Sequence, residues 1–448
     1  MAMIDLDNRD RAQQVILVGV DLPIRFGDKA GGECDLPELG RLVKTAGGTV
    51  AGEISQKRDK PDTRTFLGKG KVEDLVAAVK HTEATLVVFD NDLSPAQGRN
   101  LEKILNDGET HPDKPGDAGK VSIIDRTELI LDIFASHART RQARLQVELA
   151  QLQYMLPRLT KLWSHLERQA GGIGTRGPGE TQLETDRRIV GKRLAKLKRE
   201  LAAVAADRKV QSRRRNEQYT AALVGYTNAG KSTLLRGLTD ADVLVANKLF
   251  ATLDTTTRRI EIDERRRMMV SDTVGFIRRL PHNLVESFRA TLAEVQEADL
   301  LLHVIDASHE DPEHQIAAVE VVLRELIEKD RDMIMIFNKM DAMPAEKAEV
   351  VRNRMERLFP GSIFVSALSD DGIAEVRRVL VERMLSMETV VRLAVPYTRM
   401  DLVSVFHRTG SVLEEDHTED GMVLAVRMKD EELSRLMGQE PDVTILES

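Results

Sequence analysis

Short apolar runs alternate with longer amphipathic stretches along most of the chain, a pattern typical of α/β proteins. In the second half, the apolar runs predict strands near 219–225, 300–306, 332–337 and 362–366. The amphipathic stretches predict helices near 231–239, 311–329, 345–358 and 372–385, and 258–263 with 267–272 predict a hairpin. The pattern therefore predicts a doubly wound domain over residues 217–386, with a mixed, mostly parallel sheet.

Similar patterns predict a smaller domain at each end of the chain. Residues 1–125 are expected to form a small α/β domain, with strands near 14–20, 48–55, 84–90 and 120–125 and helices near 35–46, 69–81 and 95–106. Residues 387–448 alternate strand and helix patterns at 390–395, 402–407, 421–428 and 431–436, which predicts a small α+β domain.

A coiled-coil periodicity distinguishes residues 126–216. Leucines and other apolar residues recur four and three positions apart between 145 and 166, and again between 190 and 204. A glycine-rich run at 171–179, which no helix would tolerate, separates the two stretches. We expect a long antiparallel helix pair closed by a glycine-rich tip at about 169–180. Thr181 and Glu184 have the capping-box spacing and are expected to open the second helix.

The distribution of charge changes the interpretation of this segment. The 448-residue chain has a net charge of −8, which alone argues against a nucleic-acid partner. Residues 126–215, however, contain 20 Lys and Arg against 9 Asp and Glu, so the remainder carries −19. A basic segment in an acidic protein, with Arg168 and Arg176 near a glycine-rich tip, is typical of contact with folded RNA. A solvated helical surface and a flexible linker are the alternative interpretations.

The cysteine count and the amino terminus bear on location. Cys34 is the only cysteine, which excludes an intramolecular disulfide and fits a reducing cytoplasm. Residues 1–11 are polar and charged, unlike a secretory signal. No apolar run approaches the length of a membrane helix. We therefore expect a cytoplasmic protein with no membrane span, and a monomer.

The chemistry lies in short segments at the predicted strand ends. The first has the phosphate-loop spacing G-x-x-x-x-G-K-S, comprising Gly225, Tyr226, Thr227, Asn228, Ala229, Gly230, Lys231 and Ser232, with Thr233 following. Glycines let the backbone N–H groups approach phosphates. Lys231 would reach the β- and γ-phosphates, and Ser232 is placed to bind Mg²⁺. A glycine-rich turn before a helix is the alternative.

Three later segments complete a guanine-nucleotide pattern. Asp272, Thr273, Val274 and Gly275 follow an apolar run; Asp272 would hold Mg²⁺ and the Gly275 N–H would face the γ-phosphate. Asn338, Lys339, Met340 and Asp341 end another run, and the Asp341 carboxylate can accept from guanine N1–H and N2–H₂ together. Ser366, Ala367 and Leu368 would offer backbone N–H to guanine O6. Together they predict GTP and GDP binding and a P-loop GTPase domain.

Three features bear on hydrolysis. Many GTPases carry Gln after the Asp-x-x-Gly segment to orient water, whereas this chain has Phe276, so we expect slow intrinsic hydrolysis. The segment 246–259 carries Thr252, Thr255, Thr256 and Thr257, one of which must close on Mg²⁺, and spacing alone cannot choose among them. Asn228 suggests a hypothesis of K⁺ stimulation; its alternative role is loop stabilisation.

Three runs resemble the HflX family of ribosome-associated GTPases. They are GGIGTRGPGETQLETDRR at 171–188, DRTELILDIFASHARTRQARLQVELAQL at 125–152 and FATLDTTTR at 250–258. The similarity covers at least residues 15–385. It places Phe250, Ala251, Thr252, Leu253 and Asp254 in a first switch segment, with Thr252 as its Mg²⁺ ligand and, with Lys231 and Gly275, a catalytic residue. A hydrophobic residue at 276 is also a family trait.

The resemblance implies a Mg²⁺-dependent GTPase that binds the large ribosomal subunit in its GTP state and splits or rescues stalled ribosomes. The glycine-rich tip would enter the peptidyl-transferase region of ribosomal RNA. An alternative is a signalling switch that binds protein partners through the helix pair. A third possibility, an ATP-driven enzyme, is opposed by Asp341, because adenine lacks the paired donors.

Overall fold

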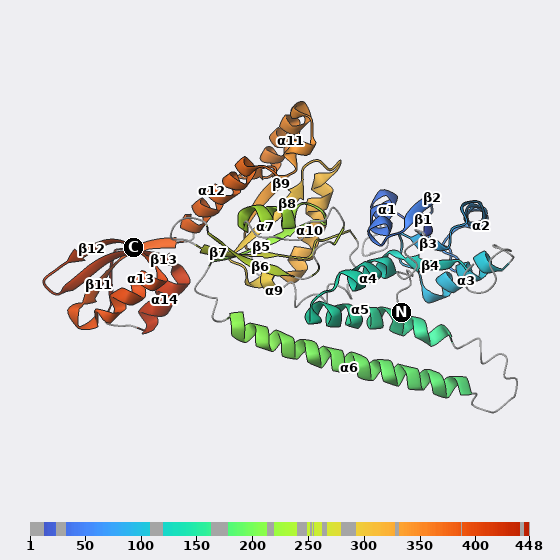
Figure 1. Ribbon diagram of the computed structural model, residues 1–448, viewed down its shortest axis with the longest axis horizontal. Coiled ribbons are helices and arrows are strands. Elements are labelled where there is room, and N and C mark those ends of the chain that lie inside the picture. Colours follow the sequence, from blue (N-terminus) through green and yellow to red (C-terminus); the bar gives the residue numbers. More distant parts are fainter. Residues whose placement is uncertain are drawn as a thin grey trace.

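The computed structural model describes residues 13–23, 33–107, 120–162, 178–212, 219–239, 249–250, 253, 255–261, 267–278, 293–327, 331–386, 388–439 and 443–447. An N-terminal sheet, a helix pair, a central domain and a C-terminal domain follow one another along the chain. The central domain lies between the two terminal domains, and the longest helix runs beneath it and the N-terminal domain (Figure 1). This arrangement confirms the predicted multidomain α/β fold.

The N-terminal sheet has four parallel strands in the order β2-β1-β3-β4. Its elements are β1 (Gln14–Asp21), α1 (Leu36–Thr45), β2 (Thr49–Lys57), α2 (Lys69–Thr82), β3 (Leu86–Phe89), α3 (Pro95–Asn106), β4 (Ser122–Asp125) and α4 (Arg126–His137). One face packs on α1 and α4, and the other on α2 and α3. Both faces are therefore covered, as expected for a parallel sheet with continuous apolar strands.

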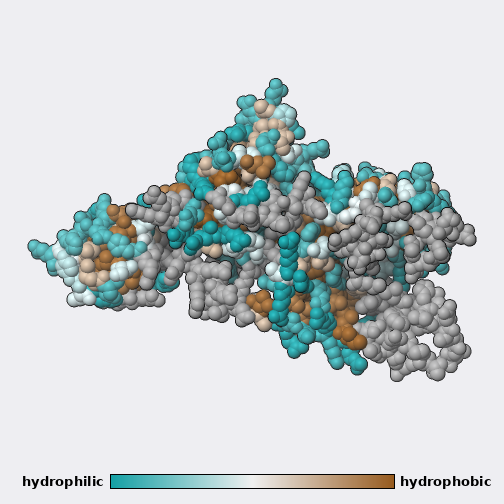
Figure 2. All heavy atoms as spheres, in the orientation of Figure 1, coloured by the Kyte–Doolittle hydropathy of each residue, from teal (hydrophilic) through white to brown (hydrophobic). Residues whose placement is uncertain are grey.

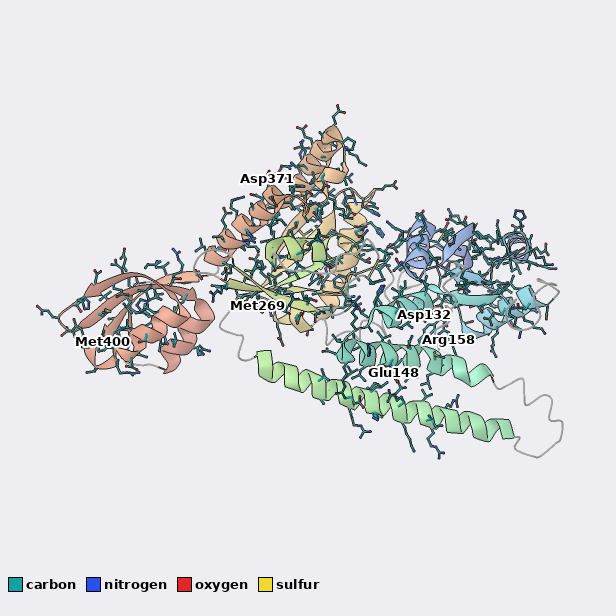
Figure 3. All side chains as sticks on the ribbon, in the orientation of Figure 1. Asp132, Glu148, Arg158, Met269, Asp371 and Met400 are labelled. Atoms are coloured by element: carbon teal, nitrogen blue, oxygen red, sulfur yellow. The ribbon has the colours of Figure 1, made fainter. Side chains whose placement is uncertain are left out.

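The helix pair consists of α5 (Arg141–Leu162) and α6 (Pro178–Ser212), which run antiparallel (Figure 1). Leu145, Leu149 and Leu197 form its buried seam, and Arg193 pairs with both carboxylate oxygens of Glu148 at 2.6 and 2.7 Å. Glu148 points from α5 toward α6 in Figure 3. The prediction that Thr181 opens the second helix is wrong: α6 begins at Pro178, whose fixed φ suits a first helical turn.

The central sheet has the order β10-β9-β8-β5-β7-β6, with only the β6–β7 pair antiparallel. Its elements are β5 (Tyr219–Gly225), α7 (Lys231–Thr239), β6 (Thr256–Glu261), β7 (Arg267–Asp272), α9 (Ala293–Glu297), β8 (Leu300–Asp306), α10 (Pro312–Leu326), β9 (Asp332–Asn338), α11 (Ala345–Leu358), β10 (Ile363–Phe364) and α12 (Asp370–Ser386). The predicted mixed, mostly parallel sheet is confirmed. Its hairpin lies at 256–261 with 267–272, two residues earlier in its first strand than predicted.

The C-terminal domain contains two strands that the hydrophobic pattern did not predict. Its elements are β11 (Glu388–Pro396), α13 (Asp401–Thr409), β12 (Ser411–His417), β13 (Gly421–Lys429), α14 (Asp430–Gln439) and β14 (Thr444–Glu447), in the antiparallel order β12-β13-β11-β14. The missed strands β12 and β14 are the two edges, and β12 is largely charged and exposed. Charge on an edge strand prevents pairing with other chains, but it hides the strand from a hydrophobicity pattern.

The described surface is mixed in character. In Figure 2, the presented face of the helix pair carries both hydrophilic and hydrophobic side chains, and hydrophobic residues gather on the C-terminal domain. Within the described ranges, no helix combines the length and the apolar character that crossing a bilayer requires.

Candidate nucleotide site

The loop between β5 and α7 has a backbone that requires glycine at two positions. Gly225 has a φ of 146°, and a Cβ there would lie 2.1 Å from the Val304 carbonyl oxygen. Gly230 has a φ of 100°, and its Cβ would lie 2.2 Å from the Asn338 side-chain nitrogen. Asn228 also has a positive φ, 63°, which Asn tolerates better than most residues. The predicted phosphate loop is therefore a tight, close-packed turn at the carboxyl end of a strand.

Lys231 is held back over this loop. Its Nζ donates to the carbonyl oxygens of Gly225, at 3.1 Å, and Tyr226, at 2.9 Å. Burial lowers the pKa of Lys231 to about 8, partly opposed by the Asp272 carboxylate. His303 is itself buried, and this burial, together with the nearby Lys231 charge, lowers the pKa of His303 to about 3, so His303 is neutral. A phosphate anion arriving at the loop would meet a preplaced cation.

Ser232 and Asp272 approach each other from the start of α7 and the end of β7. The Ser232 hydroxyl donates to Asp272 Oδ2 at 2.5 Å, and Asp272 is fully buried. Thr233, one residue further on, lines a cavity of about 570 Å³ together with Arg236, Ala367 and Leu368. The structure thus brings a hydroxyl and a carboxylate oxygen together beside the loop.

The segment after β7 pairs with the loop through its backbone. Phe276 N–H donates to Gly225 at 3.0 Å, and Thr227 N–H donates to Phe276 at 2.7 Å. A Cβ on Gly275 would lie 2.7 Å from Thr227 Cα, so only glycine allows this approach. Thr273 and Val274 are buried, and Thr273 donates to the Leu223 carbonyl at 2.6 Å. Phe276 is also buried, in a cluster that includes residues of the N-terminal domain.

The predicted first switch segment is described only in part. Phe250 has a φ of 55°, and its ring meets that of Phe134 edge-on, with centroids 4.7 Å apart. Leu253 is buried in the same cluster. Ala251, Thr252 and Asp254 lie outside the described residues, so the geometry does not address Thr252 as a metal ligand.

Asn338 connects three loops at the base-recognition end. Its Nδ2 donates to the Ala229 carbonyl at 2.9 Å, and its Oδ1 accepts from the Ala367 N–H at 2.8 Å. Lys339 has a φ of 65°, and Met340 N–H donates to the Val365 carbonyl at 3.3 Å. The predicted base-recognition residues therefore share one edge, where Asp341 and Leu368 are exposed and Ser366 accepts from the Leu368 N–H at 3.3 Å.

Asp306 is a site residue that the motifs did not identify. It ends β8, and its Oδ2 lies 2.6 Å from Lys339 Nζ, so it fixes the Lys339 side chain. A polar residue at the carboxyl end of a predicted strand, between two recognised motifs, was the available signal.

The fold, the glycine-dependent loop and the Asn338 connections define a P-loop protein of the GTPase class. Three family models match the chain: GTP-binding GTPase N-terminal over residues 33–135, GTP-binding GTPase Middle Region over 137–215, and 50S ribosome-binding GTPase over 220–339. The chain belongs to the GTPase HflX family, and it binds and hydrolyses GTP.

Curated relatives extend over most of the chain. GTPase HflX of Escherichia coli K12 is 42% identical over 438 residues, covering 97% of this chain and 98% of the relative. GTPase HflX of Alkalihalophilus pseudofirmus is 49% identical over 341 residues, covering 76% of each. Among solved structures, a GTP-binding protein from Sulfolobus solfataricus in complex with GDP is 23% identical, with 82% of this chain and all of that chain covered and a TM-score of 0.42.

Proposed function

We propose that this GTPase binds its nucleotide at the carboxyl edge of the central sheet and requires Mg²⁺. The observation that carries the site is Asn338, which joins the phosphate loop to the segment expected to meet guanine. The proposed nucleotide contacts are Gly225, Tyr226, Thr227, Asn228, Ala229, Gly230, Lys231, Ser232, Thr233, Phe250, Ala251, Thr252, Leu253, Asp254, Asp272, Thr273, Val274, Gly275, Asn338, Lys339, Met340, Asp341, Ser366, Ala367 and Leu368.

Residues at the loop fit a magnesium ion. Ser232 and Asp272 supply a hydroxyl and a buried carboxylate oxygen within 2.5 Å of each other, and oxygen ligands suit Mg²⁺. Thr252 would complete the protein's ligand set. When bound, Mg²⁺ would neutralise charge on the phosphates, while Lys231 and the Gly275 N–H stabilise the γ-phosphate.

The surroundings of Phe276 support slow hydrolysis in the isolated protein. Its ring is buried toward the N-terminal domain and has no hydrogen-bonding group, so it cannot orient the attacking water. Thr252, another residue of its segment or a partner would orient it. We further propose that K⁺ binds beside Asn228 and stimulates turnover.

The large ribosomal subunit, including its RNA, is the proposed partner. The family model matching residues 220–339 is described as a 50S ribosome-binding GTPase. The described part of α6 exposes six cations, which suit a phosphate backbone: Arg187, Arg188, Lys192, Lys196, Lys198 and Arg199. In this proposal GTP favours the bound form, the glycine-rich tip contacts ribosomal RNA, and the outcome is splitting or rescue of stalled ribosomes.

Division of the chain after residues 125, 216 and 386 would place α4 with the helix pair. We propose instead that the first boundary follows α4, because Leu129, Ile130 and Phe134 share the core of the N-terminal sheet. The boundaries at 216 and 386 are kept in this proposal.

Sedimentation with isolated ribosomal subunits tests the partner. The protein is loaded with GDP or a non-hydrolysable GTP analogue and centrifuged with large or small subunits. Co-migration with large subunits, mainly with the GTP analogue, is expected. No association in either state would leave the GTPase assignment standing and favour the signalling alternative.

A charge-reversal pair then separates RNA from protein contacts. Arg168→Glu with Arg176→Glu is expected to weaken large-subunit binding and reduce its salt dependence. Arg357→Glu, on the exposed face of α11, is the matched control and is expected to bind like the wild type. Equal binding by all variants would contradict a role for the tip.

A further inference from the structure

A hydroxyl group of the phosphate loop forms a hydrogen bond to the N-terminal domain. Tyr226, the second residue of the loop, donates its phenolic O–H to Glu38 Oε1 on α1. The Tyr226 hydroxyl oxygen also accepts a hydrogen bond from the backbone N–H of Arg278 at 2.9 Å. Tyr226 and Glu38 are 5% and 2% exposed, so water does not compete for these bonds. A single atom therefore joins the N-terminal domain, the phosphate loop and the segment after Gly275.

Arg126 fixes the other side of the Glu38 carboxylate. Its guanidinium donates to Glu38 Oε2 and, at 2.6 Å, to Asp90 Oδ1 at the end of β3. Burial acts to lower the pKa of Arg126, but Glu38 and Asp90 outweigh it and raise the pKa, so the group stays charged. The guanidinium also lies 3.4 Å from the Arg278 carbonyl oxygen. The Arg278 residue is thus held at its N–H by Tyr226 and at its carbonyl by Arg126.

Apolar contacts close around this polar network. Phe276 and Ile277 are buried in one cluster with Phe134 of α4, which also meets Phe250. The Leu249 N–H donates to Thr45 Oγ1 of α1 at 3.3 Å. Two segments that follow the phosphate loop in the sequence therefore pack against the same two N-terminal helices.

The network reaches the residues next to Lys231 and Gly275, the two proposed contacts of the γ-phosphate. The Tyr226 carbonyl accepts from Lys231 Nζ, and Phe276, two residues before Arg278, pairs with Gly225 and Thr227. Gly275, adjacent to Phe276, lies against Thr227 and Lys231, where its N–H is proposed to meet the γ-phosphate. Small displacements of such groups reduce rates strongly, whereas a buried ion pair contributes little net stability.

We propose that Glu38 is a positioning residue for GTP hydrolysis: through the Tyr226 hydroxyl and the Arg278 backbone, it holds the Gly275 segment against the phosphate loop. The hydrolysis rate then depends on the docking of the N-terminal domain. This inference rests on the proposed nucleotide site.

The full-length variants Tyr226→Phe and Glu38→Gln test the proposal. Each is expected to lower kcat for GTP by about tenfold while changing KM and GDP affinity by less than about threefold. The double variant should be no slower than the slower single variant, because both changes break the same connection. Tyr154→Phe is the matched control, since it removes a buried hydroxyl bonded to the Asp125 carboxylate within the N-terminal region. It should stay within about twofold of the wild type.

Four further observations decide the outcome. A wild-type kcat or a raised kcat in Tyr226→Phe would overturn the proposal, as would multiplicative losses in the double variant. Tyr226→Phe keeps the ring, so it provides the test if Glu38→Gln unfolds, which thermal unfolding would reveal. Failure of the nucleotide site itself is separable: Lys231→Ala would then leave GTP binding and hydrolysis intact.

Discussion

The N-terminal sheet and the central sheet place acidic groups at the same edge, the carboxyl ends of parallel strands. In the N-terminal sheet, Asp90 accepts from Arg126, and Asp125 accepts from Tyr154 and Arg158 at 2.7 and 2.9 Å. Arg158 extends from α5 beneath that sheet in Figure 3. In the central sheet, Asp272 meets a hydroxyl beside a glycine loop, and Asp341 faces solvent. One edge is filled by its own chain, whereas the other is open to a ligand.

This difference shows that the carboxyl ends of parallel strands indicate where a site can lie, but not whether that site binds a ligand. Parallel strands direct polar residues to their carboxyl ends in both sheets. Glycines with positive φ distinguish the central sheet, because Gly225 and Gly230 let the chain make a tight turn at the end of β5, a backbone shape suited to an anion. In the N-terminal sheet, α4 begins directly at Arg126, and its side chain occupies that space.

The largest expected effect on the hydrolysis rate comes from replacing a lysine of the central domain, compared with replacing a lysine of the N-terminal domain. Lys231→Ala is expected to lower the GTP hydrolysis rate by about 1000-fold, because the preplaced cation at the phosphates is lost. Lys71→Ala, in the glycine- and lysine-rich first turn of α2, should remain within about twofold. Phosphate release measures both. If Lys231→Ala kept a tenth of the wild-type rate, the assignment of its role would be wrong.

Base recognition offers the next largest effect. Asp341→Asn is expected to raise the KM for GTP by about 100-fold and to favour xanthine nucleotides, whose oxygen can accept from the amide. Asp92→Asn makes the same change at the edge of the N-terminal sheet and should leave the preference unchanged. Competition between GTP and XTP measures both variants. An unchanged guanine preference in Asp341→Asn would refute the assigned role of Asp341.

The partly buried carboxyl group of Glu128 tests the comparison through the pH dependence of stability. Burial, with the Asp125, Asp132 and Glu102 charges and against that of Arg158, raises the pKa of Glu128 to about 8. The folded state then binds more protons than the unfolded state, so this contribution is complete below about pH 4.5 and is lost as pH rises toward 8. Glu128→Gln should therefore be more stable than the wild type by about 2 kcal/mol at pH 8.

Urea unfolding between pH 5 and pH 8 measures this effect. Glu349→Gln, on the exposed face of α11, is the control and should leave the pH dependence unchanged. Parallel stability profiles for Glu128→Gln and the wild type would contradict the assigned pKa.

The smallest expected effect concerns K⁺. Turnover in K⁺ is expected to exceed turnover in Na⁺ by about fivefold if Asn228 holds the cation near the phosphates. Asn228→Gly permits the same positive φ without the carboxamide and should abolish the difference. Equal wild-type turnover in both salts would remove the hypothesis.

The elements and motifs that were predictable depend on local sequence. The phosphate-loop spacing fixed the positions of Gly225 and Gly230, and both have positive φ values. The leucine spacing predicted α5 and α6, whose seam contains Leu145, Leu149 and Leu197. The charged edge strand β12 was missed because its residues lack an apolar alternation.

The contacts that were not predictable join distant residues. Asn338 and Ala229 are 109 positions apart, and Tyr226 and Glu38 are 188 apart. Glu38 lies in the first turn of an amphipathic helix, where acidic residues are favoured for local reasons. Nothing near it in the sequence distinguishes this role from a contact with the phosphate loop.

The length of α6 gives its attachment a mechanical consequence. At 1.5 Å per residue, its 35 residues extend for about 52 Å. Its partner α5 packs on α4, the helix that carries Arg126 and Phe134. The start of α5 lies beside Glu200 of α6, to which Arg141 is paired at 4.0 Å, and the helix extends for about 33 Å from there to Pro178. A rigid rotation of about 5° at that junction would therefore displace the Pro178 end of α6 by about 3 Å. The helix pair would then act as a lever arm, in which a small rotation at the junction with α4 becomes a larger displacement at Pro178.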